Sequence, residues 1–193
     1  MAIRQWWGLI KMTLTLSQLA ILLGIGIAIP QIWALIKPVE AGAALRKFPR
    51  SEGWGYLLMA IGAGWFLYRL NQEAIAEFAA YKSYMLLGFG AVAVAACFFV
   101  PDYLAVRGMS ITMLMFAAFI LSKTRFVDTP WRLVLVIAAY IWIVAAMWWM
   151  ISPWRLRDLI QWATATPQRL KRIAMARLAF AVLVILLGAT VYK

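Results

Sequence analysis

The chain has 193 residues, of which 66% are hydrophobic and only 13% are charged. Soluble domains contain roughly 45–50% apolar and about 25% charged residues, and a soluble fold of this size could not bury so much apolar side-chain surface. The composition therefore predicts an integral membrane protein. With a formal net charge of +12, we expect the basic residues to meet anionic lipid headgroups at the ends of the spans, and we expect no nucleic acid partner.

The sequence lacks the residues on which several common chemistries depend. It has no histidine and a single cysteine, Cys97, so the usual haem and metal ligands and a thiolate cluster are excluded. Neither a P-loop, nor a dinucleotide-binding glycine pattern, nor a nucleophile elbow is present. We therefore expect a protein that is not an enzyme and that binds no cofactor and no metal.

Six apolar segments are long enough to predict membrane-spanning helices, because a helix needs about 20 residues to cross roughly 30 Å of hydrocarbon. The fourth segment is short, and a re-entrant fold there would leave five spans. The predicted fold class is an all-α polytopic membrane bundle of about six helices, in a single transmembrane domain over 1–193. The predicted spans lie near 12–36, 53–70, 83–100, 108–122, 131–151 and 173–192.

The first span is expected to be an uncleaved anchor, since no small-residue cleavage site follows it closely. We expect a bacterial-type inner (plasma) membrane protein without a cleaved signal peptide. Pro30 lies inside this span and should kink or end its helix. Eleven basic residues fall on one side of the six-span arrangement and eight on the other, which predicts that both termini lie outside the cytoplasm.

Segment 153–166 is too short to span the bilayer and is predicted to be an amphipathic helix in the interface. Its apolar residues, such as Leu156 and Ile160, recur at helical spacing on one face. Three Ser/Thr–Pro pairs, at 129–130, 152–153 and 166–167, predict helix starts, because Ser and Thr suit the N-cap and proline the first turn.

A candidate binding surface is predicted in this helix and immediately after it. One interpretation is contact with anionic lipid headgroups or with the acidic face of a partner subunit. The other is generic positive charge that only orients the chain. The loop holding Arg46 and Arg50 is expected on the same side of the membrane. The candidate residues are Trp154, Arg155, Arg157, Arg169, Lys171 and Arg172.

Pairs of small residues four positions apart let membrane helices approach closely. Three such pairs, Gly24/Ala28, Ala60/Gly64 and Ala91/Ala95, mark candidate helix contacts. Such pairs also arise by chance in a chain rich in alanine and glycine, so they predict packing only weakly.

Two functions from different classes fit the sequence. The first is a non-catalytic integral membrane subunit or assembly factor of a larger complex, acting through helix packing and contact with anionic lipids. Its expected partners are membrane lipids and other membrane protein subunits. The alternative is a small carrier or channel for a neutral or amphipathic substrate, with a path lined by Gln18, Pro30 and Gln31. The predicted span interiors hold no Asp, Glu, Lys or Arg, which disfavours proton-coupled transport.

Overall fold

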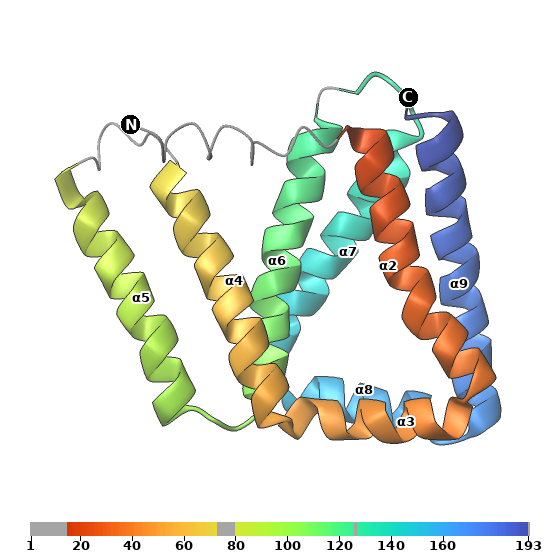
Figure 1. Ribbon diagram of the computed structural model, residues 1–193, viewed down its shortest axis with the longest axis horizontal. Helices are drawn as coiled ribbons and strands as arrows, with labels where there is room; N and C mark the ends of the chain where they lie inside the picture. Colours follow the sequence, from red (N-terminus) through yellow and green to blue (C-terminus); the bar gives the residue numbers. More distant parts are fainter. Residues whose placement is uncertain (1–14, 73–79, 126, 193) are drawn as a thin grey trace, which may run out of the picture.

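A computed structural model describes residues 15–72, 80–125 and 127–192 (Figure 1). Helices dominate these ranges, which contain no strand, and the predicted all-α class is confirmed. Five helices are long and apolar enough to cross a membrane: α2 (Leu16–Ile36), α5 (Lys82–Phe99), α6 (Leu104–Thr124), α7 (Arg132–Ile151) and α9 (Pro167–Thr190).

Another long helix, α4 (Glu52–Gln72), lies between α5 and α6 and runs across the same thickness (Figure 1). Its 21 residues would extend about 31 Å. Unlike the other five, it contains no stretch apolar enough to qualify as a span, because Gly, Trp and Tyr residues interrupt its apolar sequence. α4 contacts both α5 and α6, but it is not among the five helices that are long and apolar enough to cross a membrane.

Two predicted spans have different bounds in the structure. α6 is not short: it begins at Leu104 rather than 108 and has 21 residues, long enough to cross the bilayer. α9 begins at Pro167 rather than 173, because Thr166 caps it by accepting a hydrogen bond from the Arg169 amide at 3.3 Å. Pro30 does not end α2, which continues to Ile36. Residues 12–14 of the first predicted span lie outside the described residues.

The connection expected as a loop at 37–52 contains a helix, α3 (Pro38–Lys47), followed by a short 3-10 turn, η1 (Phe48–Arg50). α3 has a proline in its first turn, which suits the start of a helix. Glu40 near its start and Arg46 near its end complement the helix dipole. The predicted amphipathic helix is present as α8 (Trp154–Ala163). α3 and α8 contact each other and lie across the same end of the long helices (Figure 1).

Glycine residues allow helices α4 and α6 to pack at an unusually short distance from each other. A methyl group placed on Gly108 of α6 would lie 2.6 Å from the backbone nitrogen of Met59 in α4. Gly55 and Gly62 of α4 also pack closely against α6, where an added methyl group would lie 3.0 Å from Leu104 and 2.9 Å from Ile111. The hydroxyl of Thr112 donates to the Leu58 carbonyl across the contact at 3.2 Å. The two backbones can approach this closely only because no side chains intervene.

Glycine residues also allow α2 and α9 to pack closely. A methyl group on Gly24 would lie 2.8 Å from the Ala181 carbonyl oxygen, and one on Gly188 would lie 3.0 Å from the Ser17 carbonyl oxygen. The Ser17 hydroxyl donates to the Gly188 carbonyl at 2.6 Å. Of the predicted small-residue pairs, Gly24 is thus buried in a helix contact. Gly64 has no neighbour within 4 Å among the described residues.

An apolar core joins the two helix pairs at the end opposite α3 and α8. It is built by α2, α6, α7 and α9, and Leu19, Ala117, Leu135 and Val184 are almost fully buried in it. By contrast, α5 has no buried residue. It contacts α4 through the edge-to-face rings of Phe66 and Phe89, whose centroids are 5.1 Å apart. The bundle is therefore closed at both ends, by the core at one and by α3 and α8 at the other.

Replacing Gly108 with alanine should destabilise the protein, because the new methyl group meets the α4 backbone rather than a movable side chain. We expect a loss of about 1–3 kcal/mol, the usual cost of overpacking, and a melting temperature lower by about 2–4 °C for each kcal/mol. The measurement is thermal unfolding in detergent followed by tryptophan fluorescence. Gly64→Ala is the matched control, and it should keep or slightly raise the melting temperature, because the added methyl group meets no atom within 4 Å and alanine favours the helix. Equal melting temperatures for both variants would show that the close contact is not needed.

Candidate functional site

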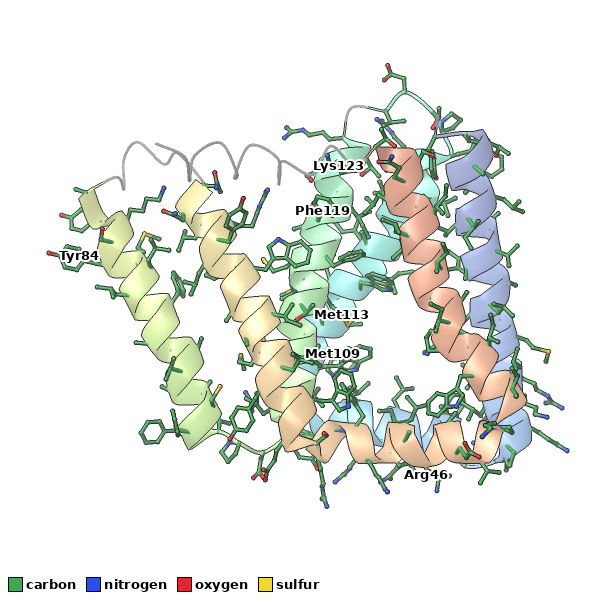
Figure 2. All side chains as sticks on the ribbon, in the orientation of Figure 1. Arg46, Tyr84, Met109, Met113, Phe119 and Lys123 are labelled. Atoms are coloured by element: carbon green, nitrogen blue, oxygen red, sulfur yellow. The ribbon has the colours of Figure 1, made fainter. Side chains whose placement is uncertain are left out.

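Basic residues gather at the end of the bundle where α3 and α8 lie. We call the layer formed by α3, α8 and the first turns of α9 (residues 38–47, 154–163 and 167–172) the basic platform. Arg46 lies at this end of the molecule (Figure 2). The platform, the adjoining connections and the neighbouring turns of α6 and α9 account for eleven of the 19 lysines and arginines. They are Lys37, Arg46, Lys47, Arg50, Arg107, Arg155, Arg157, Arg169, Lys171, Arg172 and Arg177.

A pair of hydrogen bonds joins the last turn of α3 to the end of α8. The Nε of Arg46 donates to the Thr164 hydroxyl oxygen at 3.0 Å, and one terminal nitrogen donates to the Thr164 carbonyl at 2.8 Å. Thr164 is only 4% exposed, and its own hydroxyl donates to the Ile160 carbonyl at 2.8 Å. Arg46 therefore donates hydrogen bonds to both the side chain and the backbone carbonyl of Thr164, the residue that ends α8.

An apolar contact seats α3 on the membrane-spanning helices. Ala41 packs in a small cluster with Ala34 of α2 and with Leu170 and Ala174 of α9, and all four are buried. The platform is thus fixed to the α2–α9 pair by packing and to α8 by hydrogen bonds.

Beside this contact lies a pocket that we call the arginine pocket. Its cavity volume is about 160 Å³, and residues from α3, η1 and α8 line it. Arg50 has no hydrogen bond or ion pair with any residue that the structure describes. The lining residues are Arg46, Pro49, Arg50, Arg157 and Gln161.

Two partners hold the guanidinium of Arg157 in the pocket wall. Asp158 accepts from its Nε at 2.9 Å and from one terminal nitrogen at 2.8 Å. The other terminal nitrogen donates to the Tyr103 hydroxyl at 3.1 Å. The hydrogen bond to Asp158, followed by the negative charge of that carboxylate, raises the pKa of Arg157. The guanidinium, which is protonated in proteins in any case, therefore gains a favourable charged partner.

Tyr103 reaches Arg157 from a strained backbone conformation. Its φ of 58° lies in the left-handed region, which is costly for a bulky residue and is rarely adopted without a compensating contact. Tyr103 forms the turn between α5 and α6 directly before α6 begins. The strained turn places the tyrosine hydroxyl 3.1 Å from the pocket arginine.

The predicted surface residues share the platform, but only Arg157 lines the pocket. The guanidinium of Arg155 lies 5.7 Å from the ring of Trp148, and that of Arg169 lies 5.1 Å from the ring of Trp162. Trp154, Lys171 and Arg172 are exposed. Together these residues form a broad basic and aromatic surface instead of a single site.

The sequence-based prediction missed four of the five residues that line the pocket, which are Arg46, Pro49, Arg50 and Gln161. Arg46 and Arg50 were expected only as charges of a neighbouring loop. The helix-start and helix-end signals of segment 38–47 were the available clue to α3. The pairing of α3 with α8 is a tertiary contact between segments more than 100 residues apart, and no local pattern predicts it.

The predicted path residues do not converge on one point. Gln18 caps the start of α2, where its side-chain oxygen accepts from the Thr15 amide at 3.2 Å. Gln31 follows 13 residues later in the same helix, about 20 Å along its axis. Pro30 is exposed. No group of three potential metal ligands occurs among the residues that the structure describes.

The contact between Arg46 and Thr164 can be tested with Thr164→Val, which keeps the side-chain shape and removes the hydroxyl acceptor. We expect a loss of about 1 kcal/mol at the α3–α8 contact and roughly fivefold faster amide hydrogen exchange in 38–47. Thr190→Val is the control, since Thr190 also donates to a carbonyl four residues earlier but lies on an exposed helix face. Unchanged exchange in 38–47 would show that this hydrogen bond does not hold α3 in place.

No protein-family model, curated protein or solved structure matches this chain. The candidate site therefore stands on its own geometry. That geometry is a basic platform across one end of a helical bundle, with a pocket lined by three arginines between two of its helices.

Proposed function

We propose that this chain is a non-catalytic membrane protein that binds the anionic headgroups of the bilayer through the basic platform and serves as a subunit or assembly factor of a larger membrane complex. The observation that carries the proposal is the platform itself. Two ten-residue helices lie across one end of the spans, joined to each other by Arg46 and Thr164.

The position of the platform supports contact with lipid headgroups. The connections to α2, α7 and α9 leave α3 and α8 at the level where the long helices end (Figure 1). At that level each lysine or arginine gains about 1 kcal/mol from an anionic membrane surface. The exposed rings of Trp154 and Trp162 also suit this level, because tryptophan prefers the boundary between hydrocarbon and water.

The packing of α5 supports a role in a larger assembly. α5 packs on α4 alone among the principal helix contacts, and none of its residues is buried. A span so weakly attached contributes little to the stability of this chain, which favours a use for it outside the bundle. The broad exposure of apolar side chains along α5 leaves its outer faces available to lipids and to other membrane subunits.

Lipid binding can be measured by native mass spectrometry of the full chain in mild detergent, titrated with phosphatidylglycerol or phosphatidylcholine. We expect more bound phosphatidylglycerol than phosphatidylcholine. The triple variant Arg155→Gln, Lys171→Gln, Arg172→Gln should reduce the phosphatidylglycerol affinity at least severalfold, because it removes three charges from the platform. The control, Arg69→Gln, Lys82→Gln, Arg125→Gln, removes three charges at the opposite end and should have a smaller effect.

Extraction of the chain from its native membrane in mild detergent tests the proposed role as a subunit of a larger complex. We expect the chain to leave its native membrane at a mass that includes other subunits in fixed ratio. A chain that leaves the membrane alone would contradict the subunit role. Equal binding of the two lipids, or equal losses in the two triple variants, would contradict the role of the platform.

A further inference from the structure

We propose that the arginine pocket is a binding site for a phosphate monoester, carried either by a lipid headgroup or by a soluble molecule. The inference deepens the proposed function and rests on it, because the pocket lies within the platform and would give it selectivity for one class of anion.

The pocket offers a high density of hydrogen-bond donors toward one small volume. A guanidinium has five N–H donors in a planar fork that matches the oxygen spacing of phosphate. Arg46 uses two of its donors on Thr164, and Arg157 uses three on Asp158 and Tyr103. Arg50 uses none on any described residue. Each arginine therefore keeps donors for a ligand.

Two of the three arginines are held in position before any ligand arrives. Arg46 is fixed by the buried Thr164, and Arg157 is fixed by Asp158 and by the strained Tyr103. Preorganised donors lose less conformational entropy on binding than free side chains do. Arg50, the third member, lines the pocket and has no hydrogen-bond partner among the described residues, so all of its donors remain for a ligand.

The charge of the pocket favours a doubly charged anion. Asp158 lies 2.8 Å from Arg157 and compensates one positive charge. The remaining charge corresponds to two guanidinium groups. A phosphate monoester carries about −1.5 to −2 charges at pH 7, whereas the phosphate diester of most membrane lipids carries a single negative charge. The monoester therefore matches the pocket more closely.

The size of the pocket also fits a phosphate group. Its volume of about 160 Å³ is close to that of an engineered cavity of about 150 Å³ that accommodates benzene. A phosphate group with ordered water fits in such a volume, and four of the five lining residues are arginine or glutamine, whose N–H groups can donate hydrogen bonds to its oxygens. The acyl chains of a lipid would remain outside, along the spans.

The test compares Arg50→Gln with Lys47→Gln in the full chain in mild detergent. Both changes remove one exposed positive charge from the same segment, but Lys47 does not line the pocket. The probes are phosphatidic acid, phosphatidylglycerol and soluble glycerol 3-phosphate. Affinities are measured by native mass spectrometry for the lipids and by calorimetry for the soluble ester. Equal melting temperatures of the variants and the unmodified protein establish that folding is intact.

We expect the unmodified protein to prefer phosphatidic acid over phosphatidylglycerol. Arg50→Gln should weaken phosphatidic acid binding about tenfold, the effect of losing a charge-assisted hydrogen-bond donor. Lys47→Gln should weaken it much less. Binding of glycerol 3-phosphate with the same dependence on Arg50 assigns the pocket to soluble esters as well, whereas its absence assigns the pocket to the lipid.

Equal affinity for the two anionic lipids, or equal losses in the two variants, would overturn the pocket assignment and leave the proposed function standing. A chain that binds neither anionic lipid in preference to phosphatidylcholine would contradict both.

Discussion

Two hydrogen bonds from Arg46 to Thr164 join α3 to α8, and the basic platform takes its form from that contact. They bring residues of the first and last thirds of the chain into one layer. Arg50, which follows α3, and Arg157 of α8 both line the pocket between these joined elements. A change there would separate the arginines, even if every membrane-spanning helix remained folded.

The spans support this layer through two glycine-based helix contacts. Gly108 allows α6 to meet the α4 backbone, and Gly24 and Gly188 allow α2 to meet α9. Hydrocarbon tails are as apolar as the spans, so helix pairs in a membrane depend on close packing and on hydrogen bonds such as that of Ser17. The α2–α9 pair ends at the platform, where Ala34 of α2, Ala41 of α3 and Leu170 of α9 pack together in a buried apolar contact.

The sequence was sufficient to predict the class of fold and most of the helices, because hydrophobic runs and proline-capped starts are local signals. The start of α6 was predicted four residues too late, because Arg107 was assigned to the loop although it lies in the first turn of the helix. The sequence did not predict α3, whose alanine-rich sequence resembles neither a span nor a strongly amphipathic helix. The pocket depends on contacts between distant segments, on the left-handed Tyr103 and on the pairing of Arg46 with Thr164, and none of these is encoded by spacing. Which glycines make close contacts was likewise decided by the direction in which each helix face points.

The depth of the platform in the bilayer tests the central claim most directly. Spin labels at Ala44→Cys in α3 and Leu159→Cys in α8, in a Cys97→Ala background, would be compared with labels at the exposed span position Ile141 and at the loop residue Asp128. Accessibility to oxygen and to a water-soluble nickel reagent should place both platform labels between the two references, at the level of the headgroups. Labels as accessible to the nickel reagent as the one at Asp128 would place α3 and α8 in water and contradict a platform that binds lipid headgroups.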